Sequence, residues 1–128
     1  MPSYGPPPPP KAKGLRVLVV EDDPDTLAAT LEMLQLLGHW ATGVRSAESA
    51  KDRFHEKAFD VLLTDVGLPA LSGLDLADIL RSRYPTDRLG VIFATGRPPP
   101  ETPIPGTLWL QKPFSAEQLE AALARSAV

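Results

Sequence analysis

Residues 15–25, LRVLVVEDDPD, contain an apolar run that ends at three consecutive acidic residues and a proline. The run lacks the polar alternation of a half-exposed strand, which is typical of a strand buried on both faces. Asp23 supplies a helix N-cap and Pro24 suits the first helical position, so a helix is expected to begin near Asp25. This stretch predicts a buried strand, an acidic turn and a helix.

The same alternation continues along the chain. Further apolar runs occupy residues 39–44, 59–65, 90–95 and 107–111, and amphipathic segments begin after Ser46 and near Gly73 and Ala116. Strands separated by helices favour a parallel sheet with helices packed on both faces. The sequence therefore predicts an α/β fold with a doubly wound, five-stranded parallel sheet.

Helix ends have local support. Gly38 follows the apolar face formed by Leu27, Leu31 and Leu34 and is expected to stop the first helix. Ser115, with Gln118 three residues later, predicts a capping box for the last helix.

Composition excludes several classes of protein. A chain of 128 residues is expected to form one domain, and without cysteine it has neither a disulfide framework nor a thiolate metal site. A net charge of −3 without clustered Lys and Arg argues against direct nucleic-acid binding. The apolar run around residues 17–20 is too short to span a bilayer and no signal peptide is evident, so we expect a cytoplasmic protein with no membrane contact.

The first 14 residues differ from the rest of the chain. Six of the first ten residues are proline, and no apolar periodicity follows until Leu15. Residues 1–14 are predicted to be a disordered or polyproline-type tail, acting as a passive linker or as a docking segment for a proline-reading partner. The folded domain is expected to span residues 15–128.

Polar residues follow the predicted strands. Glu21, Asp22 and Asp23 follow the first strand, and Asp65, Thr95 and Lys112 follow the third, fourth and fifth. Ligands bind at the carboxyl ends of such strands, so these side chains are expected to converge. Several carboxylates brought together repel one another and favour a bound cation, and oxygen ligands without histidine or cysteine suit Mg²⁺ or Mn²⁺.

Asp65 is the predicted nucleophile. A carboxylate flanked by a metal ion, a lysine and a hydroxyl suits phosphoryl transfer onto that carboxylate, because Lys112 neutralises phosphoryl charge and Thr95 donates a hydrogen bond. Taken alone, Asp65 is also compatible with an exposed loop aspartate or a helix cap.

The motifs VLVVEDD, VLLTDVGLP, FATG and LQKPF, in this order and spacing, resemble the receiver domain of bacterial two-component response regulators. The resemblance covers about residues 15–127 and implies a flavodoxin-like strand order, 2-1-3-4-5. It implies that Asp22 is a direct metal ligand, that Glu21 acts through water, and that Asp65 and the backbone carbonyl of Gly67 complete the protein ligands of Mg²⁺. Asp23 is then the helix cap.

The resemblance also assigns the residues around the phosphoryl group. Asp65 matches the phosphoacceptor, Thr95 the switch hydroxyl, Lys112 the phosphate-binding lysine, and Pro113 the proline that usually follows in a cis peptide bond. Trp109 matches an aromatic switch position that is usually tyrosine or phenylalanine. The alternative is a strand tryptophan that simply packs on the sheet.

The segment FATGRPPPETPIPG, residues 93–106, departs from the usual receiver pattern. Its five prolines, at 98, 99, 100, 103 and 105, exclude a regular helix. The fourth helix of the family, between the fourth and fifth strands, is therefore expected to be replaced by a proline-rich loop. The start of the segment resembles variant receivers named for a Phe-Ala-Thr-Gly signature, although Arg97 departs from the apolar residue expected there.

The resemblance implies a phosphorelay protein rather than an enzyme with an external substrate, one that catalyses only its own phosphorylation and dephosphorylation. Its partners would be a histidine kinase or histidine phosphotransfer protein and a downstream protein. Alternatives are a receiver excised from a hybrid histidine kinase and a pseudo-receiver that only binds partners. A phosphatase would need a second carboxylate where Gly67 stands. No DNA-binding module follows residue 128, so direct control of transcription is not expected.

Overall fold

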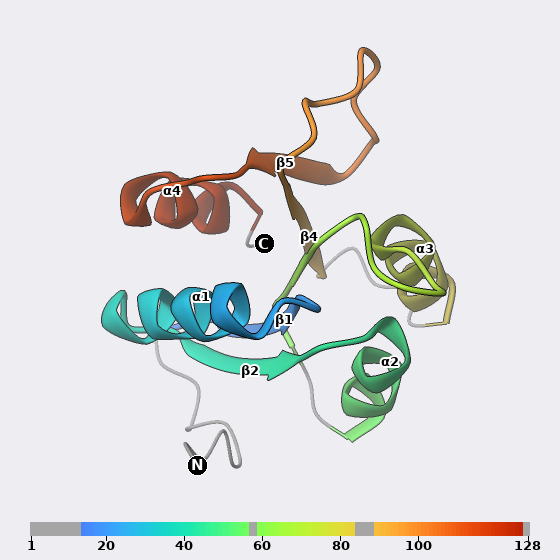
Figure 1. The fold of residues 1–128 in the computed structure, drawn as a ribbon, viewed down its shortest axis with the longest axis horizontal. Coiled ribbons are helices and arrows are strands. Elements are labelled where there is room, and N and C mark those ends of the chain that lie inside the picture. The colour runs from blue at the N-terminus through green and yellow to red at the C-terminus, as the bar shows by residue number, and fades with distance from the viewer. Residues whose placement is uncertain (1–13, 57–58, 84–88, 127–128) are drawn as a thin grey trace.

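A computed structural model describes residues 14–56, 59–83 and 89–126 of the chain. The predicted proline-rich tail lies outside these residues, except for Gly14. Five strands alternate with helices along the chain, as Figure 1 shows. The strands are β1 (Arg16–Val20), β2 (Trp40–Val44), β3 (Val61–Thr64), β4 (Gly90–Thr95) and β5 (Thr107–Gln111). The helices are α1 (Pro24–Leu36), α2 (Ala47–Glu56), α3 (Gly73–Arg83) and α4 (Ala116–Ser126).

The strands form one parallel sheet in the order β2-β1-β3-β4-β5. In Figure 1, α1 and α4 lie on one side of the sheet and α2 and α3 on the other. Side chains of β1 alternate between the two cores, with Val17 and Val19 facing one and Leu18 and Val20 the other. The predicted sheet, its strand order and its two helical layers are confirmed.

Local capping explains where two helices begin. The Asp23 carboxylate accepts a hydrogen bond from the backbone N–H of Thr26 at 2.9 Å, and Pro24 begins α1. Before α4, Ser115 and Gln118 exchange two hydrogen bonds, each from one backbone N–H to the other side chain. Both predicted caps are present.

The interval between β4 and β5, residues 96–106, contains turns and bends but no helix. The chain has a fourth helix, α4, but it follows β5 rather than preceding it. The loop is tethered by Arg81 of α3, whose guanidinium donates hydrogen bonds to three carbonyl oxygens, those of Leu89, Pro105 and Gly106. The predicted replacement of a helix by a proline-rich loop is therefore confirmed.

β5 departs from the expectation of a strand buried on both faces. Thr107, Leu108 and Trp109 are only partly buried, and Gln111 is exposed. β5 is an edge strand with α4 following it, and residues 96–106 supply no helix that could cover it further. Its apolar run reflects the packing of individual side chains rather than full burial.

Candidate functional site

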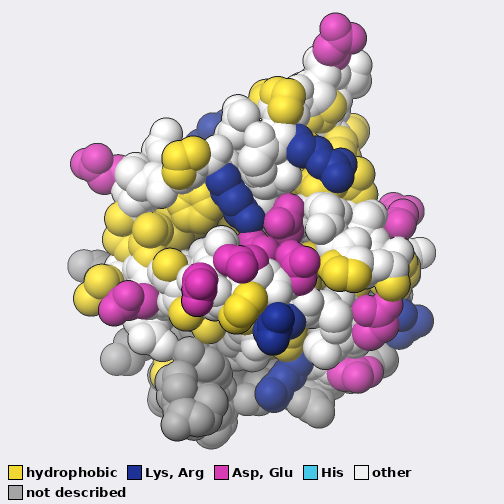
Figure 2. All heavy atoms as spheres, in the orientation of Figure 1, with side chains coloured by type: hydrophobic (Ala, Val, Ile, Leu, Met, Phe, Trp, Pro, Cys, Tyr) yellow, Lys and Arg dark blue, Asp and Glu magenta, His cyan; other side chains and the backbone are white. Residues whose placement is uncertain are grey.

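The carboxyl ends of the strands bring the predicted site residues together. Backbone hydrogen bonds continue one residue beyond the strands, from Glu21 N–H to Val44, from Asp65 N–H to Val20 and from Lys112 N–H to Thr95. These bonds fix the backbone of Glu21, Asp65 and Lys112. In Figure 2, acidic side chains gather near the centre of the molecule with basic side chains beside them.

The acidic cluster is formed by Glu21, Asp22 and Asp65. One carboxylate oxygen from each residue lies within 4.8 Å of the others. Glu21 is 5% exposed, so its charge is largely removed from water. The donor set consists of oxygen atoms on neighbouring strand ends, which fits a hard divalent cation such as Mg²⁺. Arg45 approaches this cluster but donates to the backbone carbonyl of Asp22, at 3.1 and 3.2 Å, rather than to a carboxylate.

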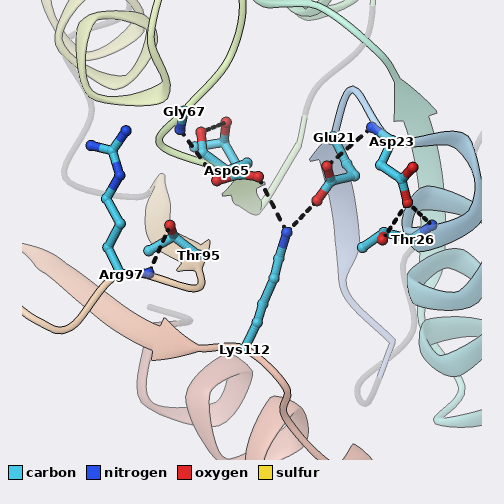
Figure 3. Close-up of polar contacts among 9 residues, drawn as sticks. Glu21, Asp23, Thr26, Asp65, Gly67, Thr95, Arg97 and Lys112 are labelled. Carbon is cyan, nitrogen blue, oxygen red and sulfur yellow. Dashed lines mark hydrogen bonds and ion pairs between the residues drawn. The ribbon is translucent and has the colours of Figure 1, made fainter.

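Lys112 connects two of the carboxylates, as Figure 3 shows. Its Nζ lies 2.5 Å from Glu21 Oε1 and 3.2 Å from Asp65 Oδ2. Burial alone would lower the pKa of Lys112, but the hydrogen bond and charge of Glu21 and the charge of Asp65 outweigh it and raise the pKa above its usual value. The ammonium therefore stays charged beside Asp65 at neutral pH.

The turn after β3 orients Asp65. Its Oδ1 accepts a hydrogen bond from the backbone N–H of Gly67 at 3.2 Å. The start of α3 packs against the same turn so closely that a Cβ atom on Gly73 would lie 1.8 Å from the carbonyl oxygen of Asp65. Only glycine fits there, so the sequence of α3 helps to set the position of the predicted phosphoacceptor.

Thr95 and Trp109 are linked through Arg97. The backbone N–H of Arg97 donates to Thr95 Oγ1 at 3.3 Å, and its carbonyl oxygen accepts from Trp109 Nε1 at 3.0 Å. The Trp109 ring also packs against Phe93, with ring centroids 6.0 Å apart. Thr95 is 3% exposed at the end of β4. The predicted cis peptide bond between Lys112 and Pro113 is present.

Two contacts were not predicted from the sequence. The resemblance assigns Glu21 a role toward the metal through water, and the structure adds an ion pair between its carboxylate and Lys112. Arg97 departs from the Phe-Ala-Thr-Gly signature, and its Nη2 lies 3.3 Å from where a Cβ on Gly67 would be. The available signal was the position of Arg97, two residues after a strand-end threonine, where a long cation can reach back over the site.

Residues 17–124 match the model of the family described as response regulator receiver domain. Response regulator protein FleR of Pseudomonas aeruginosa is 33% identical over 118 residues, covering 88% of this chain and 24% of FleR. The gliding motility regulatory protein of Myxococcus xanthus is 36% identical over 92 residues, covering 72% of this chain and 12% of that protein. The chain thus spans less than a quarter of the length of both relatives.

Solved structures agree with this match. The chemotaxis protein CheY4 of Vibrio cholerae superimposes with a TM-score of 0.80 at 25% identity, covering 88% of this chain and 98% of that one. The receiver domain of the hybrid histidine kinase CckA gives a TM-score of 0.72 at 26% identity, covering 87% and 97%. Among the described residues, no helix combines the length and apolar character needed to cross a membrane. With this fold and a family match over most of its length, the chain belongs to the response regulator receiver domains of two-component systems.

Proposed function

We propose that this receiver accepts a phosphoryl group on Asp65 from a phosphohistidine of a histidine kinase or a histidine phosphotransfer protein. The observation that carries the proposal is the position of Lys112, whose ammonium lies 3.2 Å from Asp65 Oδ2 inside an acidic cluster. A lysine that holds one carboxylate oxygen beside two further acidic groups suits phosphoryl transfer better than it suits a passive surface ion pair.

The metal in this proposal is Mg²⁺ or Mn²⁺. Glu21, Asp22 and Asp65 would hold it with the backbone carbonyl of Gly67, and the clustering of the three carboxylates supports this assignment. When bound, the ion supplies positive charge that offsets the negative charge of the phosphoryl oxygens.

Three residues of the site have defined roles in the proposed transfer. An Asp65 carboxylate oxygen forms the new O–P bond while the P–N bond of the phosphohistidine breaks, and the imidazole leaves with the bonding electron pair. Lys112 neutralises charge on a phosphoryl oxygen, and the Thr95 hydroxyl donates a hydrogen bond to another. Thr95 Oγ1 accepts a hydrogen bond from the backbone N–H of Arg97, so the proton of the Thr95 hydroxyl is available to donate to a phosphoryl oxygen.

The output is proposed to be contact with a downstream protein through a surface that includes the loop of residues 96–106. The absence of a helix from this loop supports the resemblance to the Phe-Ala-Thr-Gly variant receivers. Both single regulators and receivers of hybrid kinases remain compatible with the chain, because its similar structures include the receiver domain of CckA. Whether this receiver acts as a single regulator or as a domain of a hybrid kinase does not change the proposed phosphorylation of Asp65.

Phosphorylation is tested by intact-mass spectrometry after incubation with Mg²⁺ and acetyl phosphate. The wild type is expected to gain one phosphate and Asp65→Asn none, while Asp78→Asn, an exposed acid on α3, should behave like the wild type. Absence of phosphate on the wild type, with donor and metal verified on another receiver, would contradict the proposal and favour a pseudo-receiver that only binds partners.

A further inference from the structure

Arg97 and Gly67 share the mouth of the site. Gly67 has no side chain, and the space beside its Cα is bordered by the guanidinium of Arg97, whose Nη2 lies 3.3 Å from the position of a Cβ. Because the N–H of Gly67 donates to Asp65 Oδ1, this space adjoins the predicted phosphoacceptor. The guanidinium of Arg97, which follows β4, thus lies beside Gly67, the position after β3 that has no side chain.

The backbone of Arg97 is fixed at both of its polar groups. Its N–H donates to Thr95 Oγ1 and its carbonyl accepts from Trp109 Nε1. Arg97 is exposed, so its side chain is accessible to a small anion. In Figure 3, Arg97 and Gly67 lie on one side of Asp65 and Lys112 on the other. Gly67 and Lys112 also contact different carboxylate oxygens, Oδ1 and Oδ2.

The charge of the phosphorylated site favours a second cation, Arg97, in addition to Lys112. Lys112 is already paired with Glu21 and Asp65, whereas within the described ranges no ion pair engages the guanidinium of Arg97. Phosphorylation replaces the single negative charge of Asp65 by an acyl phosphate that carries about two. One lysine and one divalent cation then leave an excess negative charge beside Glu21 and Asp22, and Arg97 is positioned to offset it.

We propose that Arg97 is a phosphoryl-binding residue, whose guanidinium donates to a phosphoryl oxygen on Asp65 from the side opposite Lys112. The proposal rests on the proposed function, because it requires a phosphoryl group at Asp65. With acetyl phosphate as donor, an Asp65 oxygen forms a bond to phosphorus, the bond from phosphorus to the acetyl oxygen breaks, and acetate leaves with the electron pair. Arg97 moves no proton and stabilises the anion on the protein.

The first test measures binding of beryllofluoride, a mimic of an aspartyl phosphoryl group, to the full chain in saturating Mg²⁺ by NMR titration. Arg97→Gln is expected to weaken binding about tenfold, the effect of losing one hydrogen bond to a charged group. Arg97→Lys should recover part of that loss through its charge. Arg125→Gln removes an exposed arginine from the last turn of α4, which lies beside the start of β4 rather than the carboxyl ends of the strands, and should bind like the wild type.

Mg²⁺ binding without beryllofluoride separates this role from a structural one. Removing the cation beside Gly67 should leave Mg²⁺ affinity unchanged or raise it, because Arg97 repels the metal ion. Structural damage to the site would lower the affinity for both Mg²⁺ and beryllofluoride. Weaker binding of beryllofluoride together with unchanged or tighter binding of Mg²⁺ would therefore support phosphoryl binding by Arg97. A parallel loss of affinity for both ligands would overturn it.

A second variant displaces the guanidinium without removing it. Gly67→Met fills the space beside Arg97 and is expected to weaken beryllofluoride binding in the wild type but much less in an Arg97→Gln background. Equal binding by wild type and Arg97→Gln, with Asp65 phosphorylated in both, would overturn the assignment of Arg97 alone. Failure of the wild type to bind beryllofluoride and to accept phosphate would overturn the proposed function as well.

Discussion

The indole N–H of Trp109 donates a hydrogen bond to the carbonyl oxygen of Arg97, with a distance of 3.0 Å between Nε1 and the oxygen. Phenylalanine has no such donor, and the hydroxyl of tyrosine lies elsewhere on its ring. The contact ties β5 to the first residues of the proline-rich loop. Since the backbone N–H of Arg97 also donates to Thr95 Oγ1, the backbone of this one residue connects the predicted switch threonine to the aromatic residue.

Trp109→Phe is expected to loosen the start of the loop. Loss of one partly exposed hydrogen bond should lower the free energy of unfolding by about 1 kcal/mol. Amide hydrogen exchange at Arg97 should become faster, because its carbonyl loses its anchor. Urea denaturation and residue-resolved exchange measure the two effects.

Trp40 provides a matched control for this prediction. Its Nε1 is buried without a hydrogen-bond partner among the described residues. Trp40→Phe therefore removes an indole but no hydrogen bond to the loop, and exchange at Arg97 should stay as in the wild type. Unchanged exchange in Trp109→Phe would show that the indole contact does not hold the loop.

Arg81 is expected to hold the other end of the same loop. Its Nη2 lies 3.3 Å from the carbonyl oxygen of Leu89 and 2.5 Å from that of Gly106. Arg81→Ala should destabilise the protein by about 1 to 2 kcal/mol, because these carbonyls lose charged donors. The amides of Ile104, Gly106 and Thr107 should exchange faster, whereas those of Gly96 and Arg97 should change less.

Arg81→Lys tests the geometry of this contact. Lysine keeps the charge but lacks the planar fork that reaches several carbonyls at once, so only part of the stability should return. If Arg81→Ala unfolds at the same urea concentration as the wild type, the tether contributes nothing and the loop is held by other contacts.

The capping carboxylate of α1 predicts a pH dependence. Hydrogen bonds from the hydroxyl and then the backbone N–H of Thr26 hold the pKa of Asp23 below its usual value. Because the folded-state pKa is the lower one, the stabilisation is present above the unfolded pKa of about 4 and is lost as pH falls through the folded pKa. The wild type should therefore lose stability relative to Asp23→Asn below about pH 4.

Asp23→Asn is the appropriate comparison because asparagine also caps helices but does not titrate. Denaturant unfolding of both proteins between about pH 6 and pH 2.5 gives the difference in unfolding free energy. A difference that stays constant over this range would mean that the Asp23 charge adds nothing to the cap.

The fold was predictable because its signals are local. Asp23 and Ser115 cap helices within three residues, and the buried strands have apolar runs that need no distant partner to be recognised. The convergence of Asp22 and Asp65 followed from the rule that parallel strands end at the same edge of a sheet. These predictions concern backbone positions, which hydrogen bonding fixes.

Contacts made by long side chains were less predictable. No sequence signal indicates that Lys112 contacts Glu21 as well as Asp65, or that Arg97 lies beside Gly67 rather than in solvent. Arg81 finds loop carbonyls that lie 24 or 25 residues away in the chain. Flexible cations have many rotamers, and the tertiary arrangement of charges and carbonyls selects among them.

The acidic cluster predicts opposite effects of one substitution on stability and metal binding. Asp22 lies within 4.8 Å of carboxylate oxygens of Glu21 and Asp65, so without metal it repels both. Asp22→Asn should raise the free energy of unfolding of the metal-free protein by about 1 kcal/mol. The same change should weaken Mg²⁺ binding at least about tenfold, because it removes a proposed ligand.

Thermal unfolding with and without Mg²⁺ separates the two effects of Asp22→Asn. The wild type should melt at a higher temperature as Mg²⁺ is added, since a ligand that binds only the folded state stabilises it. The variant should start higher and gain less. Asp25→Asn, an exposed acid in the first turn of α1, removes the same charge outside the cluster and should respond to Mg²⁺ like the wild type. An equal gain in Asp22→Asn would exclude Asp22 as a ligand, because a carboxylate that coordinates the ion cannot be replaced by an amide without loss of affinity.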